Sequence, residues 1–167
     1  TPYQAEISQG RLEALLLFQT MVSDFTGLPV CNSSLLDEAT AAAEATIMTF
    51  NARSRELVKR GADTILISDT IFSQTKEVII SRAEPLGINV KIMPYTDFVF
   101  DDTVFAAMVQ YPDSNGEIQD YKDVSVKSHA HGAVCMAVCV IMSLALLTPP
   151  AEWGADVAVG STQRFGV

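Results

Sequence analysis

The chain has 167 residues, of which 49% are hydrophobic, and its formal net charge at pH 7 is −9. This length fits one domain, which can bury about 70% of the surface that its unfolded chain exposes. Nucleic acids and anionic membranes bind clustered Lys and Arg, so the acidic balance argues against both as partners.

Residues 1–60 predict helices that lead into the domain. Apolar side chains recur at helical spacing across residues 6–25, and the Gly-Leu-Pro sequence that follows predicts the end of this helix. Residues 34–37 read Ser-Leu-Leu-Asp and resemble a capping box, which predicts a long second helix over residues 36–58. Slim alanine side chains in that helix would let another element approach its backbone closely.

Strands and helices alternate over residues 61–167. The predicted strands are residues 64–68, 89–93, 103–110, 133–138 and 156–160, and helices are predicted over residues 74–83 and 118–131. Apolar residues on both faces of these strands, with helices between them, imply a mostly parallel sheet in a three-layer α/β domain. The chain stops seven residues after the last strand. We therefore expect residues 1–167 to form a single incomplete α/β domain, a piece of a longer protein.

Cysteines and histidines give no sign of a metal site. Cys31, Cys135 and Cys139 lie among apolar residues and are odd in number, which predicts reduced core thiols in a reducing compartment. His129 and His131 would point to opposite sides of a helix, with no carboxylate nearby in suitable register. We interpret both histidines as ordinary polar residues at a helix end and expect no metal.

The sequence lacks the motifs that define several functional classes. No Gly-x-Gly-x-x-Gly sequence follows a predicted strand, and there is neither a phosphate-binding loop nor a Gly-x-Ser-x-Gly elbow. The longest apolar run, residues 133–147, is shorter than the ~20 residues that cross a bilayer. Dinucleotide binding, nucleoside triphosphate binding, serine-hydrolase chemistry and a transmembrane segment therefore have no support.

The start of the second predicted helix is a candidate anion site. Helix N-termini bind phosphate groups through free N–H groups and the positive end of the helix dipole. Asp37 and Glu38 occupy this first turn, and their carboxylates would repel a phosphate while accepting the same hydrogen bonds. We interpret the feature as a self-capped structural helix.

Polar residues at the two ends of the chain are further candidates. Residues 160–162 turn the chain out of the last predicted strand, and α/β sheets usually place their chemistry just beyond the carboxyl ends of strands. The opening segment, residues 1–10, is dense in hydrogen-bonding side chains. It is either an exposed polar helix start or a surface that faces a partner's active site, and composition does not choose between these interpretations.

Five blocks of sequence, in order over the whole chain, carry a resemblance to a known family. They are residues 1–10 (TPYQAEISQG), 34–45 (SLLDEATAAAEA), 109–112 (VQYP), 144–150 (LALLTPP) and 160–167 (GSTQRFGV). They resemble glycine decarboxylase, the P-protein of the glycine cleavage system. That family has two similar halves, in one chain or two subunits, each with the fold type I architecture of aspartate aminotransferase-like enzymes. The blocks resemble its amino-terminal half.

The resemblance implies a supporting role in an oxidoreductase. Only the carboxy-terminal half of the family carries the lysine that holds pyridoxal phosphate, and the amino-terminal half contributes to the shared site. The assembled enzyme decarboxylates glycine and transfers the aminomethyl group to the lipoyl arm of H-protein. The implied partners are therefore the catalytic half and H-protein, in the bacterial cytoplasm or the mitochondrial matrix. This piece alone would be inactive and would hold no cofactor.

Residue by residue, the resemblance implies lost cofactor contacts. Gln163 stands at the position of the Schiff-base lysine, and an amide cannot form a Schiff base. Phe72 lies at or near the position of the residue that stacks on the cofactor ring. Residues 138–144 read Val-Cys-Val-Ile-Met-Ser-Leu where this half of the family often has Ala-Asp-Ile-Met-Ser-Leu. The carboxylate expected to pair with the pyridinium nitrogen is therefore missing.

The hypothesis from the sequence is a non-catalytic half that packs against the catalytic half. Tyr3, Gln4, Glu6 and Ser8 are the candidates for residues near the shared pocket. Apolar surface left uncovered on the isolated piece predicts self-association. The alternatives are a stand-alone pyridoxal-phosphate enzyme that uses another lysine and a non-enzymatic interaction module. The available lysines are Lys59, Lys76, Lys91, Lys122 and Lys127, all at positions where a solvated charge is expected.

Overall fold

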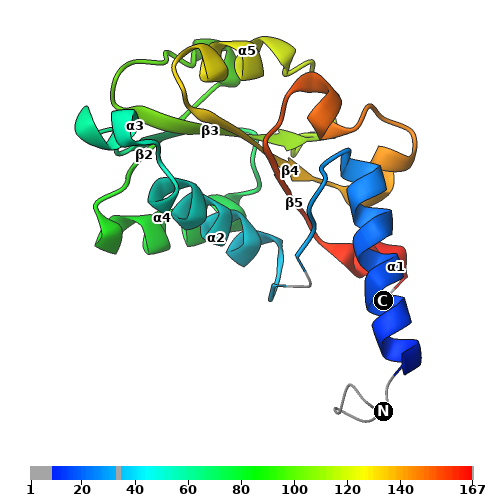
Figure 1. Cartoon of the computed structure of the whole chain (residues 1–167). Helices are drawn as coiled ribbons and strands as arrows, with labels where there is room; N and C mark the ends of the chain where they lie inside the picture. Colours follow the sequence, from blue (N-terminus) through cyan, green and yellow to red (C-terminus); the bar gives the residue numbers. More distant parts are fainter. Residues whose placement is uncertain (1–8, 33–34, 167) are drawn as a thin grey trace.

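A computed structural model describes residues 9–32 and 35–166, which build a parallel sheet with helices on both faces (Figure 1). The strands are β1 (Thr64–Ser68), β2 (Asn89–Met93), β3 (Val104–Tyr111), β4 (Val134–Cys139) and β5 (Val157–Val159). Their order is β2-β1-β3-β4-β5, and every neighbouring pair is parallel. Each strand end lies within one residue of its prediction. The predicted three-layer α/β architecture is confirmed.

The helices are α1 (Gln9–Thr26), α2 (Glu38–Asn51), α3 (Arg55–Lys59), α4 (Ser73–Ala83) and α5 (Lys122–Ala130). Short 3₁₀ turns are η2 (Glu84–Leu86), η3 (Tyr95–Asp97), η4 (Ile141–Ala145), η5 (Pro150–Trp153) and η6 (Thr162–Phe165). α2 and α4 cover one face of the sheet and α5 covers the other (Figure 1). α1 stands beside the β5 edge and projects away from the sheet (Figure 1).

Alternation along the strands fills two separate cores. Ile65 and Ile67 of β1 face the core under α2 and α4, whereas Leu66 between them faces the core under α5. The alanine-rich face of α2 packs closely on the sheet, as predicted: Ala42 is fully buried and the Thr49 hydroxyl lies 3.4 Å from the sulfur of Met136 on β4. The small side chains therefore let α2 approach the sheet closely.

The predicted second helix, residues 36–58, is wrong at its start and in its middle. The N-cap is Asp37, whose Oδ1 accepts a 2.7 Å hydrogen bond from Thr40 N; Ser34, expected to open the capping box, lies outside the described residues. α2 ends at Asn51, and α3 begins after Ser54, whose Oγ accepts from Leu57 N at 3.2 Å. A second N-cap therefore divides the predicted helix in two.

The helix predicted over residues 118–131 is also shorter in the structure, where α5 begins at Lys122. Asp113 Oδ1 accepts from Glu117 N at 2.9 Å, and Asp120 Oδ1 accepts from Lys122 N at 3.0 Å. These side-chain bonds hold the backbone in turns and delay the first helical residue.

The strand order places the carboxyl ends of β1 and β3 side by side, where the direction of chain progression changes. β1 is followed by its neighbour β2 on one side, and the chain then crosses to β3 on the other. In open α/β sheets such a switch point is the usual place for a ligand. Within the described residues, no helix combines the length and apolar character needed to span a membrane.

Candidate functional site at the carboxyl edge of the sheet

At the switch point, hydrogen bonds join the N-cap of α4 and Tyr121 to Gln110 of β3. Phe72 N, at the N-cap of α4, donates to Oε1 of Gln110 at 3.1 Å, and Tyr121 OH donates to the backbone oxygen of Gln110 at 2.9 Å. Ser68 Oγ and Thr70 Oγ1 lie 2.9 Å apart just beyond β1. Gln110 is fully buried, and its Nε2 has no hydrogen-bond partner among the described residues. The site is thus organised around a buried amide.

Phe72 lies at this edge of the sheet. It is half-buried, and its backbone N–H is bound to Gln110. The structure therefore places Phe72 beside the switch point.

Gln163 lies in η6, directly after β5, with an exposed side chain. Its backbone N–H donates to Ser161 Oγ at 3.3 Å. Gly160, the residue that follows β5, approaches β4 so closely that a Cβ there would lie 2.3 Å from Cys139 O. Position 160 therefore requires glycine, because any side chain would strike the β4 backbone.

The N-terminus of α2 is filled by side chains of the chain itself, as the self-capping interpretation predicted, although with Asp37 as the cap. Glu38 opens the helix with a side chain only 12% exposed, and its Oε2 lies 3.9 Å from Nη1 of Arg164 in η6. Burial raises the pKa of Glu38, and Arg164 and the N–H of Ser161 partly offset this rise. Glu38 thereby joins α2 to the turn that contains Gln163.

Cys139 occupies the end of β4. It is buried opposite Tyr111 of β3, and burial raises its pKa to about 12. The thiol is therefore neutral at physiological pH and offers no negative charge. Cys135, on the same face of β4, is also buried and its pKa is likewise raised by burial to about 12. Cys31 is only half-buried, so its prediction as a core thiol is wrong.

The described residues at this edge do not fit pyridoxal phosphate. The position that the family resemblance assigns to the Schiff-base lysine carries an amide, the helix N-terminus carries two carboxylates, and the end of β4 carries a neutral thiol. Lys76 is the lysine that contacts this edge: its Nζ donates to Asp69 O, just beyond β1, at 2.6 Å. Lys59, Lys122 and Lys127 are exposed, and Lys91 is half-buried in β2.

The shared-pocket candidates Tyr3, Gln4, Glu6 and Ser8 lie outside the described residues. Their position relative to the carboxyl edge therefore remains a prediction.

The interpretation of His129 as lacking a nearby carboxylate is wrong. Its Nε2 lies 2.9 Å from Oδ2 of Asp156, which also accepts from Cys135 N at 2.8 Å. His131 instead stacks on Phe100 with ring centroids 6.0 Å apart. Residues 9–32 and 35–166 contain no cluster of three metal-ligating side chains. The His129–Asp156 pair joins α5 to the start of β5, a role consistent with packing.

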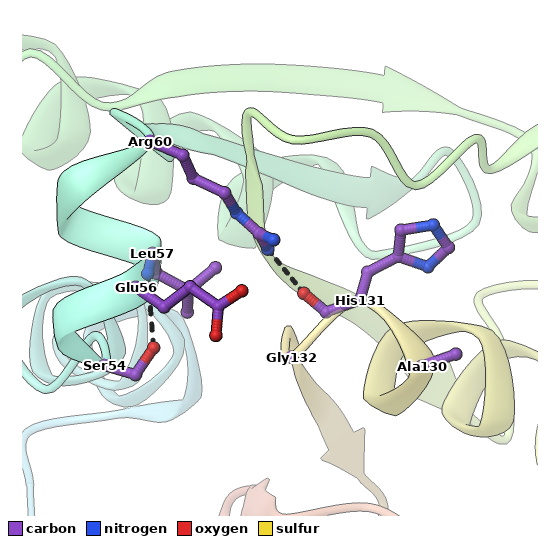
Figure 2. Close-up of a pocket in the computed structure, with 7 residues that line it drawn as sticks. All are labelled: Ser54, Glu56, Leu57, Arg60, Ala130, His131 and Gly132. Carbon is purple, nitrogen blue, oxygen red and sulfur yellow. Dashed lines mark hydrogen bonds between the residues drawn. The ribbon is translucent and has the colours of Figure 1, made fainter.

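A separate pocket of about 210 Å³ opens at the amino edge of the sheet, between α3 and the end of α5 (Figure 2). Arg60 crosses it and donates to the backbone oxygen of His131, and the side chain of Glu56 lies nearby (Figure 2). Arg60 also pairs with Asp102 at 3.8 Å. The pocket lies at the opposite edge from Gln110 and Gln163, and its polar groups join α3 to α5.

Comparisons with known proteins match the whole chain. The family model for the glycine cleavage system P-protein matches residues 1–167. A glycine dehydrogenase (decarboxylating) of Bacteroides fragilis is 51% identical over 99% of this chain and 18% of its own length. A mitochondrial glycine dehydrogenase (decarboxylating) of Dictyostelium discoideum is 53% identical over 100% of this chain and 16% of its own length. The chain thus spans less than a fifth of these relatives.

Solved structures agree with the sequence relatives. A crystal structure of glycine decarboxylase (P-protein) in inhibitor-bound form matches with a TM-score of 0.85 and 32% identity, over 100% of this chain and 38% of that chain. An O-acetylhomoserine (thiol)-lyase of Campylobacter jejuni that contains pyridoxyl-lysine monophosphate matches over 87% of this chain and 34% of its own, with a TM-score of 0.69 and 18% identity, which shows a shared fold. The chain belongs to the glycine cleavage system P-protein family.

Proposed function

We propose that this chain is part of the amino-terminal, non-catalytic half of a glycine decarboxylase. In the assembled enzyme, the catalytic half holds pyridoxal phosphate, and this half supports that site and forms part of its border. The observation that carries the proposal is Gln163: an exposed amide stands directly after β5, at the position that the family resemblance assigns to the Schiff-base lysine. Residues 1–167 are then one incomplete α/β domain, with a helical segment over 1–60 and alternating strands and helices over 61–167.

The whole protein is proposed to decarboxylate glycine and to pass the aminomethyl group to the lipoyl arm of H-protein. The relatives' name, glycine dehydrogenase (decarboxylating), supports this assignment. Its partners are then the catalytic half and H-protein. We place the protein in the bacterial cytoplasm or, in a eukaryote, in the mitochondrial matrix, as the name of the Dictyostelium relative suggests.

The supporting role is consistent with how the carboxyl edge is built. Glu38 and Arg164 bring the α2 N-terminus and η6 together, and Gln110 binds the N-terminus of α4 to β3. These contacts use the groups that a cofactor would otherwise need. We propose that they give this half a rigid edge against which the catalytic half packs.

One observation favours a second candidate function, a stand-alone pyridoxal-phosphate enzyme. Lys76 contacts the carboxyl edge through a 2.6 Å hydrogen bond from its Nζ to Asp69 O. Substitution of this lysine separates the two hypotheses, because arginine keeps the positive charge but cannot form a Schiff base.

We expect Lys76→Arg in the full-length enzyme to change the rate of glycine decarboxylation by less than about twofold. Lys122→Arg, at an exposed position on α5, is the matched control. A loss of about a thousandfold or more in Lys76→Arg alone, together with loss of the aldimine absorbance band, would instead assign the Schiff base to Lys76.

A further inference from the structure

α1 carries an exposed apolar surface, here called the α1 stripe, that nothing in the described chain covers. Its members are Leu12, Leu15, Leu16, Leu17 and Met21. Leu16 is 65% exposed and Leu17 is 63% exposed, although both lie in the middle of an 18-residue helix. Contiguous exposed leucines of this kind mark an interaction surface.

The contacts that hold α1 to the domain lie at its carboxyl end. Phe25 stacks on Phe165 of η6 with ring centroids 6.2 Å apart, and Thr26 is buried. Gly27 follows so close to Pro149 and Ala151 that a Cβ would lie 3.3 Å and 3.0 Å from theirs. The amino-terminal part of α1 projects beyond the rest of the molecule (Figure 1). The helix is therefore anchored at one end, and its other end is exposed.

The sequence of α1 indicates that more than one side of this helix is buried against other protein surfaces. Residues 14–23 contain no charged side chain. Leu16 and Leu17 are consecutive and therefore point about 100° apart around the helix, so the apolar surface is not a single narrow face. A helix that is apolar around most of its circumference is normally buried inside a larger assembly.

We propose that the α1 stripe packs against the catalytic half of the enzyme; this inference rests on the proposed function. The occupant must be apolar, because the stripe offers no charge for pairing. A second copy of this chain would bring another net charge of −9, which opposes association. The relatives are more than five times as long as this chain, so most of the protein that could cover α1 lies outside it.

Within the part of the protein that lies outside this chain, the position of α1 favours the catalytic half as the occupant of the stripe. Both of its anchors, η4 and η6, follow carboxyl ends of strands, so α1 stands at the edge that the proposed function turns toward the shared site. Residues 1–8, which include the four shared-pocket candidates, directly precede α1 in the sequence. If those residues reach the partner's pocket, the helix joined to them lies on the partner.

The test places a photo-crosslinking benzoylphenylalanine at position 16 of the full-length enzyme and maps the crosslinked peptides by mass spectrometry. We expect crosslinks to the catalytic half. Position 126, on α5 and 59% exposed as valine, is the matched control and should crosslink to that half much less. Crosslinks from position 16 only to the remainder of the amino-terminal half, or to α1 of a second copy, would overturn the proposal.

Two further measurements separate this inference from the proposed function. Leu16→Arg should lower the yield of assembled enzyme at least tenfold, whereas Val126→Arg should not; equal yields would overturn the inference. Borohydride reduction of the same crosslinked sample locates the Schiff base independently. A Schiff base on the catalytic half without crosslinks to it leaves the proposed function standing and removes the role of the α1 stripe. A Schiff base on a lysine of this chain removes the proposed function itself.

Discussion

At the scale of single residues, the carboxyl edge of the sheet depends on the close approach of the chain after β5 to β4. Gly160 allows the chain at the end of β5 to pack directly against the β4 backbone at Cys139. Gly160→Ala would place a Cβ 2.3 Å from Cys139 O, so the strands must separate or shift. We expect a loss of at least about 2 kcal/mol in the free energy of unfolding, measured by urea titration of the protein.

Gly10→Ala is the control for this substitution, because nothing lies within 4 Å of the Cβ it would add. Alanine also has the higher helix propensity, so this variant should match or exceed the wild type in stability. Equal stability of Gly160→Ala and Gly10→Ala would show that β5 does not pack on β4 as described.

Glu38 makes stability depend on pH. Because burial raises its pKa, ionised Glu38 is less favourable in the folded than in the unfolded protein. The contribution of Glu38 to stability is therefore fullest below its unfolded pKa, ~4.3, and falls as pH rises through the higher folded pKa. Glu38→Gln removes this titration, and we expect its stability relative to the wild type to be greater at pH 7 than at pH 4.

Chemical denaturation at the two pH values measures this difference. Glu77→Gln is the matched control, because it makes the same change at an exposed position on α4. A relative stability of Glu38→Gln that is greater at pH 4 than at pH 7 would mean that Arg164, 3.9 Å away, outweighs the cost of burial.

At the scale of elements, the helix caps decide where one helix ends and the next begins. Ser54→Ala removes the hydrogen bond from Leu57 N to the Ser54 hydroxyl at the start of α3, and we expect a loss of about 1 kcal/mol. Ser73→Ala is matched, since Ser73 is the first residue of α4 and its N-cap makes no side-chain hydrogen bond. Equal effects of both substitutions, in thermal unfolding, would contradict the assignment of Ser54 as a cap.

The strands and the helix break illustrate what the sequence can predict. Strands such as β1 are continuous apolar runs, and their burial on both faces follows from composition, so their ends were predicted within one residue. Residues 52–54 continue a helical pattern, and Ser54 signals a cap only if the chain is already known to turn there. Every residue along a buried strand indicates its burial, whereas a helix cap depends on one side chain.

The candidate site likewise has features that the sequence predicts and features that it does not. The anionic first turn of α2 was predictable because Asp37 and Glu38 are adjacent in the sequence. The contact of Glu38 with Arg164 and the pair of His129 with Asp156 join residues far apart in the chain. No local pattern predicts such contacts, since they depend on how parallel strands bring their ends together.

At the scale of the whole molecule, we propose that this chain belongs to one half of an enzyme whose chemistry lies in the other half. The carboxyl edge keeps the geometry of a pyridoxal-phosphate fold but holds Gln163, a neutral Cys139 and a self-filled α2 N-terminus. The α1 stripe is exposed and apolar, and we propose that it is a surface for assembly. Together these features favour a half that positions and supports a site carried by the catalytic half.

The location of the Schiff base tests this account most directly. The full-length protein is incubated with pyridoxal phosphate, reduced with borohydride and digested, and the modified peptide is identified by mass spectrometry. We expect one stoichiometric adduct on a lysine outside residues 1–167, with an aldimine absorbance band before reduction. A stoichiometric adduct on Lys76, or on any other lysine of this chain, would contradict it.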